Sequence, residues 1–364
     1  DFSIRWTGKI RVDSDGEYQF FVQGDDGFRL FVNGQKIIDE WQDQGATLKD
    51  AKLSLKAGML ADIKLEYFEH TGDAQVSFGW AKAVNRQDSE ALKLAATSDV
   101  AVVCVGFNAT TEGEGFDRSF ALSNEQQELI KEVAKVNAKT IVVLSAGGNV
   151  AMSEWLDGVA GLLHTWYPGQ EGGTALAEIL FGDVNPSGKL PATFEKRWED
   201  NATFSSYYAV DQKVNFKEGV FLGYRHFDAR NIEPQFPFGF GLSYTNFGYR
   251  NLTVTPSSSA QDPRVKVEFE VENSGQREGA EVAQIYVREL NPGIARPVKE
   301  LKGFEKLRLK PGETKKVSVV LDRNAFAYYD VAGKQWAVKP GAFEISVASS
   351  SRLIRFSQQV KLSK

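Results

Sequence analysis

A short segment of this chain, residues 108–118, combines acidic residues and glycines in a pattern that suits proton transfer. It follows an apolar run at residues 100–105, which is typical of a buried strand. In open α/β sheets, ligands bind in the loops beyond the carboxyl ends of the strands, so a functional site is expected here. Glu114 lies between two glycines, which leave the backbone room to present its carboxyl group as a general acid.

Two other interpretations of this segment stay open at this point. Glu112 is a second carboxyl group two positions earlier, and it competes with Glu114 for the role of acid. The segment is also compatible with a solvated polar loop in which Asp117 and Arg118 form a surface network. The spacing by itself does not choose between these interpretations.

The other chemistry-bearing residues do not form a metal or phosphate motif. The three histidines lie far apart in the sequence and Cys104 is the single cysteine, so no zinc, iron–sulfur or disulfide site is expected. Residues 147–148 and 169–173 are glycine-rich but lack the spacing of phosphate-binding loops, and they predict tight turns. The segment Asp25-Asp26-Gly27 suits either a structural turn or part of a calcium site, which needs six to eight oxygens. We expect no metal and no cofactor.

Composition excludes several classes of protein. The chain has 364 residues, a length that predicts two or three domains, and 42% of its residues are hydrophobic, which excludes a disordered chain. Its 43 basic and 48 acidic residues give a net charge of −5, so nucleic acid is not an expected partner. No apolar run approaches the ~20 residues of a membrane-spanning helix, so no membrane partner is expected.

The hydrophobic pattern divides the chain into three parts, with predicted boundaries of 1–85, 86–245 and 246–364. In the first part, residues 28–33 alternate between apolar and other side chains, and Asn33-Gly34 then predicts a tight hairpin. The last part also alternates with period two and predicts a small β-sandwich of the fibronectin type III kind.

The middle part predicts an α/β sandwich. Its apolar runs at 100–106 and 140–144 suit parallel strands that are buried on both faces. Between them, residues 123–126 form a capping-box sequence that predicts the start of an amphipathic helix, and a further helix is predicted over 171–181. The predicted fold class is therefore a multidomain combination of α/β and all-β parts.

Several longer motifs resemble glycoside hydrolase family 3, the β-glucosidase family. These motifs, which occur in the family's order, are Glu114-Gly115-Phe116-Asp117-Arg118 and residues 166–173, 181–191, 218–225, 236–244, 281–284 and 299–304. In addition, residues 24–34 resemble the PA14 module that some members insert into their α/β sandwich. The resemblance covers essentially the whole chain.

The resemblance implies a retaining β-glycosidase built from an N-terminal (β/α)8 barrel, an α/β sandwich and a C-terminal fibronectin type III-like β-sandwich. The acid/base of the family aligns with Glu114, which stands directly before the glycine–aromatic–Asp–Arg run. The family's nucleophile is an aspartate on the barrel within Ser-Asp-Trp, a sequence that this chain does not contain. No barrel sequence precedes residue 86, so we expect the C-terminal half of a longer enzyme, whose partner is the barrel portion.

The resemblance also implies which residues contact the substrate. Phe116 adjoins the acid, and the loop of residues 40–45 carries Trp41 and Asp43, which are expected to line the subsite for the leaving group. An exposed Trp41 ring can stack on a sugar face, whereas a Trp41 packed in the core of its own module cannot. The sequence leaves both placements of Trp41 open.

The predicted function is that of a retaining exo-β-glucosidase, which releases terminal β-D-glucose from oligosaccharides or aryl β-glucosides with Glu114 as general acid/base. Two alternatives stay open, a β-xylosidase of the same family and a non-catalytic PA14-type carbohydrate-binding protein. The expected location is periplasmic or secreted, and the C-terminal sandwich is compatible with a homodimer.

Overall fold

The computed structural model divides the chain into two units, Asp1–Tyr167 and Pro168–Lys364, and each is described by itself. The structure describes residues 1–70, 74–83, 90–208, 213–256 and 263–362. No helix among these residues has the length and apolar character needed to cross a membrane. The predicted boundaries at residues 85 and 245 stay predictions, because the division of the structure falls at a different place.

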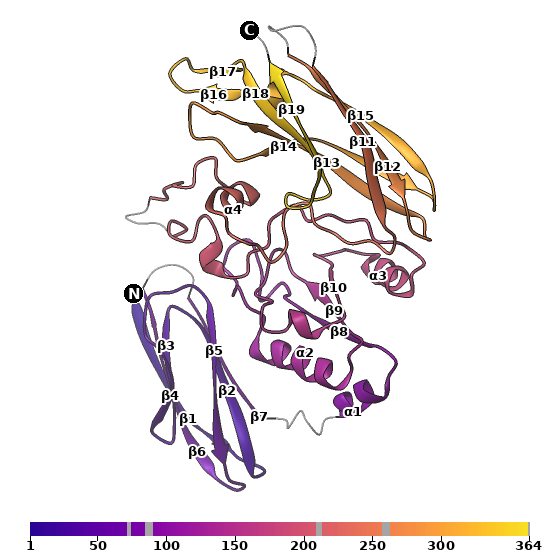
Figure 1. Ribbon diagram of the computed structural model, residues 1–364. Helices are drawn as coiled ribbons and strands as arrows, with labels where there is room; N and C mark the ends of the chain where they lie inside the picture. The colour runs from indigo at the N-terminus through magenta and orange to yellow at the C-terminus, as the bar shows by residue number, and fades with distance from the viewer. Residues whose placement is uncertain (71–73, 84–89, 209–212, 257–262, 363–364) are drawn as a thin grey trace. The chain divides into compact units, whose positions relative to one another are not determined.

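The first unit begins with seven antiparallel strands in two sheets, drawn in indigo to violet in Figure 1. One sheet has the strand order β1-β6-β3-β4 and the other has the order β5-β2-β7. The strands are β1 (Phe2–Arg11), β2 (Gly16–Asp25), β3 (Gly27–Val32), β4 (Gln35–Glu40), β5 (Thr47–Leu55), β6 (Leu60–Glu69) and β7 (Gln75–Lys82).

The predicted alternation along residues 28–33 is confirmed in this β-strand module. Phe28, Leu30 and Val32 of β3 are fully buried, and they pack with Phe20 and Val22 of β2 in one core. Asn33 and Gly34 have φ angles of 50° and 79° and join β3 to β4, so this hairpin is the predicted one. The core therefore lies between the two sheets, as in a β-sandwich.

The rest of the first unit is a small α/β layer (Figure 1). Its strands form a parallel sheet of order β10-β9-β8, as predicted from the apolar runs. The elements are α1 (Glu90–Thr97), β8 (Ala101–Gly106), α2 (Asn124–Val136), β9 (Thr140–Ser145), a 3-10 helix (Leu156–Gly158) and β10 (Gly161–His164).

Two expectations about β8 need correction. The sequence predicted a strand buried on both faces, but only Ala101, Val103 and Val105 are buried, whereas Val102 and Cys104 are exposed. The physical reason is one-sided cover, because α2 packs on one face of β8 and successive side chains of a strand point to opposite faces. Cys104 is therefore an accessible thiol and not a small hydrophobic side chain of the core.

The predicted start of α2 is confirmed, but its capping box is not complete. The Ser123 side chain caps the helix by accepting a hydrogen bond from the backbone N–H of Gln126 at 3.4 Å. The Gln126 side chain does not return to the cap and instead bonds both backbone groups of Gly106, at 2.7 and 3.0 Å. The helix start is thereby tied to the end of β8, where the candidate acid loop begins.

The second unit begins with a largely irregular segment that carries α3 (Gly172–Phe181), a 3-10 helix (Trp198–Asp200) and α4 (Tyr224–Arg230). Helix α3 occupies the predicted position and ends at Gly182, whose φ of 80° is the left-handed conformation that glycine favours at a helix end. A buried ion pair joins the segment to the following strands, since Lys189 donates to Glu281 at 3.0 Å.

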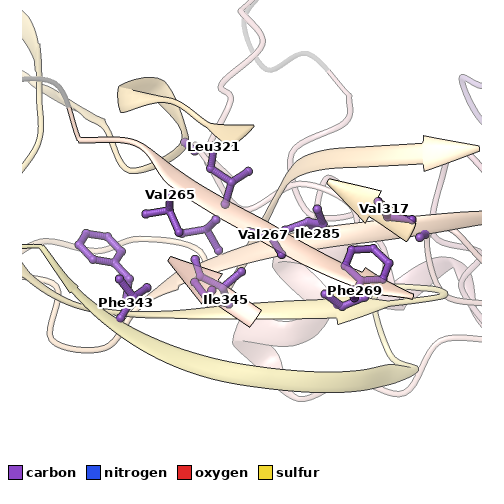
Figure 2. Packing of buried hydrophobic residues seen from close by; sticks show 14 of the residues in the cluster. Val265, Val267, Phe269, Ile285, Val317, Leu321, Phe343 and Ile345 are labelled. Carbon is purple, nitrogen blue, oxygen red and sulfur yellow. The ribbon is translucent and has the colours of Figure 1, made fainter. Parts of the chain in front are cut away.

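The predicted C-terminal β-sandwich is confirmed. Sheets of order β11-β12-β15 and β14-β13-β18-β19 enclose one core, in which Figure 2 shows Val265, Val267 and Phe269 of β12 packed with Phe343 and Ile345 of β18. The strands are β11 (Phe247–Pro256), β12 (Val265–Asn273), β13 (Gly279–Glu289), β14 (Glu300–Leu309), β15 (Thr314–Leu321), β18 (Gly341–Ala348) and β19 (Ile354–Leu362), with a 3-10 helix (Arg323–Ala325) and the hairpin of β16 (Tyr328–Asp330) and β17 (Gln335–Ala337).

Candidate active site

The candidate acid loop, residues 107–118, leaves the sheet at a fixed point. Gly106 ends β8 with a φ of 146°, and a Cβ atom built there would lie 1.9 Å from the carbonyl oxygen of Ser145 on β9. Glycine is therefore required at this position. The next residue, Phe107, donates its backbone N–H to the same Ser145 oxygen at 2.9 Å. The loop thus begins at the carboxyl edge of the sheet, as the sequence predicted.

The first half of the loop is ordered by Asn108. Its side-chain oxygen accepts hydrogen bonds from the backbone N–H and the hydroxyl of Thr110, at 2.9 and 2.7 Å. The Asn108 N–H donates in turn to the hydroxyl of Thr111 at 2.9 Å. Such side-chain bonds to nearby backbone groups stabilise a turn, and this one precedes both candidate carboxyl groups.

Glu114 lies at the tip of a tight turn in this loop. Gly113 and Phe116 form an isolated antiparallel bridge, so Glu114 and Gly115 are the two residues that reverse the chain. The Glu114 side chain is exposed. Phe116 covers Gly113, because a Cβ atom on Gly113 would lie 2.6 Å from Cε1 of the phenyl ring. Glu114 and Phe116 are therefore together, and both are accessible to a ligand.

Glu112 has a different environment, and this difference separates the two carboxyl groups. Its Oε1 accepts from Nε of Arg118 at 2.7 Å, and its Oε2 accepts from the Gly147 N–H at 2.9 Å and from the Tyr167 hydroxyl. The side chains of Glu112 and Arg118 are only 18% and 15% exposed. Glu112 is therefore an anchored, internally bonded carboxylate, whereas Glu114 is free to meet a ligand.

The charge state of Glu112 follows from these contacts. Partial burial by itself raises the pKa of this carboxyl group, but the hydrogen bonds from Gly147, Tyr167 and Arg118 outweigh burial and hold the pKa below its ordinary value. Glu112 is therefore ionised at neutral pH and holds no proton to deliver. Burial, together with the bond to Glu112, raises the pKa of the Tyr167 hydroxyl to about 12.

Arg118 closes the loop at its other end. Besides its bond to Glu112, its guanidinium donates to the carbonyl oxygens of Ser119 and Asn149, at 2.9 and 2.6 Å. The guanidinium also lies over the Phe107 ring, with Cζ 4.7 Å from the ring centroid. Arg118 is thus held inside the base of the loop, with its side chain only 15% exposed.

The segment after β10 completes the surroundings of the loop. His164 and Trp166 pack edge to face with their ring centroids 4.4 Å apart. Burial, reinforced by the positive charge of Arg118, lowers the pKa of His164 to about 4, so its imidazole is neutral at neutral pH. Trp166 has a φ of 55°, a conformation that side chains other than glycine rarely adopt. This turn directly precedes Tyr167, whose hydroxyl reaches Glu112.

Trp41 and Asp43 lie on the connection between β4 and β5 and are held by contacts within their own module. The Trp41 ring meets Phe68 edge to face at 4.8 Å, and the Arg29 guanidinium lies 4.3 Å from its centroid. Asp43 accepts from Nδ1 of His70 at 2.8 Å. Trp41 is 39% exposed and lies outside the buried core of the module, so its ring is accessible.

The Asp25-Asp26-Gly27 segment has a structural role in the same module. Asp26 is buried, and its two oxygens accept from the backbone N–H groups of Gln44 and His70, at 2.9 and 2.8 Å. Asp25, Asp26 and Glu69 place carboxylate oxygens within 4.8 Å of one another, a spacing compatible with a cation. The backbone bonds of Asp26 favour the structural turn that the sequence analysis weighed against a calcium site.

Sequence reasoning missed Gly147, Tyr167 and Gln126 as residues that position the loop. Tyr167 lies in a motif that carried the family resemblance, and Gly147 lies in a segment predicted only as a tight turn. The available signal was positional, since both residues directly follow parallel strands whose carboxyl ends share an edge with the acid loop.

Comparison with known proteins identifies the family. Residues 34–244 match the glycosyl hydrolase family 3 C-terminal domain, and residues 281–351 match the fibronectin type III-like domain. The chain belongs to glycosyl hydrolase family 3. Its relatives include a beta-glucosidase of Rhizobium radiobacter, 36% identical over 383 residues, which cover 100% of this chain and 47% of that protein. The thermostable beta-glucosidase B of Acetivibrio thermocellus is 44% identical over 275 residues, which cover 75% of this chain and 36% of that protein.

Solved structures agree with this assignment. A crystal structure of the beta-glucosidase from Kluyveromyces marxianus in complex with glucose superposes with a TM-score of 0.73 at 33% identity. The superposition covers 100% of this chain and 45% of the Kluyveromyces marxianus chain. This family 3 chain therefore spans about half the length of its relatives, or less, and the residues that the structure describes contain no (β/α)8 barrel.

Proposed function

We propose that this chain is the acid/base-bearing portion of a longer retaining β-glucosidase. The observation that carries the proposal is the contrast between two neighbouring carboxyl groups. Glu114 is exposed at the tip of a turn beyond the carboxyl edge of a parallel sheet, whereas Glu112 is fully engaged by internal donors. Of these two carboxyl groups, Glu114 is therefore the one proposed to carry a proton to a bound sugar.

In the proposed reaction, Glu114 donates its proton to the glycosidic oxygen as the bond from that oxygen to the anomeric carbon breaks. A second carboxylate bonds to the anomeric carbon and forms the glycosyl-enzyme intermediate. Glu114, now ionised, takes a proton from the water that displaces the enzyme carboxylate, and glucose is released with retained configuration. Retaining hydrolysis requires the two carboxyl groups to be about 5–5.5 Å apart.

We assign the second carboxylate to the portion of the enzyme that this chain does not include. The relatives are about twice as long as the matched region, and the sequence holds no Ser-Asp-Trp. The nucleophile is therefore proposed to be an aspartate on the N-terminal (β/α)8 barrel. On this account the chain by itself hydrolyses nothing, and no cofactor takes part.

The proposed substrate is a terminal β-D-glucoside. The relatives of Rhizobium radiobacter and Kluyveromyces marxianus are both named beta-glucosidase, and a glucose complex exists for the latter. Phe116 is proposed to contact the substrate beside Glu114, since its ring is partly exposed on the same turn. A β-xylosidase of the same family stays the second candidate.

The first strands, β1–β7, are proposed to be a PA14-like module inserted in the α/β domain. Some relatives match the whole chain and others only 75% of it, a difference close to the length of this module. Trp41 and Asp43 on the β4–β5 connection are proposed to contact the leaving group of the substrate, which takes up the proton from Glu114. One face of the Trp41 ring is covered by Arg29, so a sugar would stack on the other.

The test of the proposed function is Glu114→Gln in the full-length enzyme. General acid catalysis contributes about 10²–10⁴-fold, so kcat/KM for cellobiose should fall by that factor. The fall should be far smaller for 2,4-dinitrophenyl β-glucoside, whose leaving group needs no proton. Glu128→Gln, an exposed glutamate on α2, is the matched control and should match the wild type. Normal cellobiose turnover by Glu114→Gln would rule the assignment out.

A further inference from the structure

We propose that Glu112 is a positioning residue for the acid turn. In this role, Glu112 is the anchor through which Gly147, Tyr167 and Arg118 fix the place of Glu114. The inference rests on the proposed function of Glu114 and extends it to four residues to which sequence reasoning gave no such role.

The turn is closed at its base by an ion pair. Glu112 and Arg118 stand on either side of residues 113–117 and join at 2.7 Å, with both side chains largely buried. Because this pair is shielded from water, it holds the two ends of the turn together more strongly than an exposed pair would. The short span between them leaves the residues at the tip little freedom.

The same carboxylate attaches the turn to the ends of two other strands. Gly147 follows β9 and donates its N–H to Oε2 at 2.9 Å, and Tyr167 follows β10 and donates its hydroxyl to the same atom. Arg118 adds a bond to the Asn149 carbonyl oxygen. One side chain therefore connects the loop after β8 to the loops after β9 and β10.

Two local features indicate that the backbone is shaped around this contact. A Cβ atom on Gly147 would lie 2.8 Å from Oε1 of Glu112, so any side chain there would displace the carboxylate. Trp166 adopts the strained left-handed conformation immediately before Tyr167. Gly147 thus leaves room for the carboxylate, and the strained turn at Trp166 brings the Tyr167 hydroxyl onto it.

Glu114 itself has no side-chain anchor. In the part of the chain that the structure describes, its carboxyl group makes no hydrogen bond or ion pair, which suits a group that must meet the substrate. Its position is therefore set by the backbone of the turn, and so by Glu112. A displacement of about 1 Å in a reacting group can lower a rate by about 10²-fold, so loss of the anchor should affect the acid step.

The experiment uses Tyr167→Phe and Glu112→Gln in the full-length enzyme. Tyr167→Phe removes a single oxygen and leaves the ring, so the fold should be kept. For cellobiose we expect kcat/KM to fall about 10-fold in Tyr167→Phe and about 100-fold in Glu112→Gln, with the loss in kcat and not in KM. For 2,4-dinitrophenyl β-glucoside, kcat/KM should change less than about 3-fold, because that leaving group does not need the acid.

The outcomes separate this inference from the proposed function. If both substrates lose activity in equal proportion, or neither loses any, Glu112 does not position the acid and the inference is overturned. Glu114→Gln is measured alongside: if that variant also leaves the ratio of the two substrates unchanged, the proposed role of Glu114 fails as well. A changed ratio in Glu114→Gln with an unchanged ratio in the anchor variants refutes the positioning role alone. Glu128→Gln again serves as the control.

Discussion

Gly147→Ala is the perturbation that tests the account of the acid loop most finely, because it adds a single methyl group. That methyl would lie 2.8 Å from Oε1 and 3.2 Å from Cδ of Glu112, and 3.4 Å from Cε2 of Tyr167. Ordinary contact begins at 3.4 Å, so the carboxylate would have to retreat by about 0.6 Å. The backbone can stay in place, since the φ of Gly147 is not in the left-handed region.

The size of the effect follows from the contacts of Glu112. A hydrogen bond to a charged group contributes about 1.5–3 kcal/mol, so weakening these bonds should cost about 2 kcal/mol of unfolding free energy. Replacing glycine by alanine where the backbone conformation allows it stabilises the folded state by about 0.4–1 kcal/mol, because alanine lowers the conformational entropy of the unfolded chain. The net loss should therefore be about 1 kcal/mol, which is too small to unfold the domain.

The effect on catalysis should be larger than the effect on stability. Retreat of Glu112 shifts the turn that carries Glu114, and we expect kcat/KM for cellobiose to fall by about 10-fold or more. The assay pairs urea denaturation with the ratio of cellobiose to 2,4-dinitrophenyl β-glucoside activity in the full-length enzyme. Gly161→Ala on β10 is the control, because its methyl would lie 3.8 Å from Ile141, in ordinary contact. A Gly147→Ala enzyme with the wild-type ratio of activities would refute the reasoning.

Three further predictions concern other parts of the chain. Trp41→Ala should raise KM about 5-fold for long oligosaccharides and leave short glucosides unchanged, because ring stacking is worth about 1 kcal/mol; equal kinetics on both substrates would exclude a role for Trp41. Because the pKa of His164 is about 4 in the folded chain and 6.5 in the unfolded chain, only the unfolded chain protonates this histidine between those pH values. Stability should therefore fall as pH is lowered from 6.5 to about 4. After allowance for partial exposure, the loss should be about 2 kcal/mol in urea denaturation and should be absent from His164→Gln. Glu281→Gln should lower the unfolding free energy by about 3 kcal/mol, because Glu281 accepts from Lys189 and Tyr249 and its loss leaves the buried Lys189 charge unpaired; a loss under 1 kcal/mol would contradict this.

The elements of the fold were predictable from the sequence where local rules decide the structure. Alternation placed Phe28 and Leu30 inside the β-strand module, and Asn33-Gly34 marked its hairpin. Ser123 marked the start of α2. Each of these signals is short in range and does not depend on what packs beyond the neighbouring residues.

The prediction for β8 was wrong because it needed tertiary information. A continuous apolar run does not show whether one face or both faces of the strand are covered, so the exposure of Val102 and Cys104 could not be read from it. The placement of Gln126 was missed for a related reason. It satisfies the capping-box pattern locally, but the backbone of Gly106 competes successfully for its side chain.

The candidate site was predictable only in part. The glycines beside Glu114 indicated a presented carboxyl group, and the structure does expose it. The different environment of Glu112 depends on Gly147 and Tyr167, which are 35 and 55 residues away along the chain. No spacing rule connects these residues, because they meet only when three parallel strands end at the same edge of a sheet.

The most direct test of the central claim is azide rescue of Glu114→Ala in the full-length enzyme with 2,4-dinitrophenyl β-glucoside. Without the acid/base, the glycosyl-enzyme should accumulate, because no group activates water for its hydrolysis. Azide needs no such activation, so it should displace the enzyme carboxylate, accelerate turnover and give β-glucosyl azide. The wild type should show no acceleration. Failure of azide to accelerate Glu114→Ala, or formation of the α-azide, would contradict the assignment of Glu114 as the acid/base of a retaining enzyme.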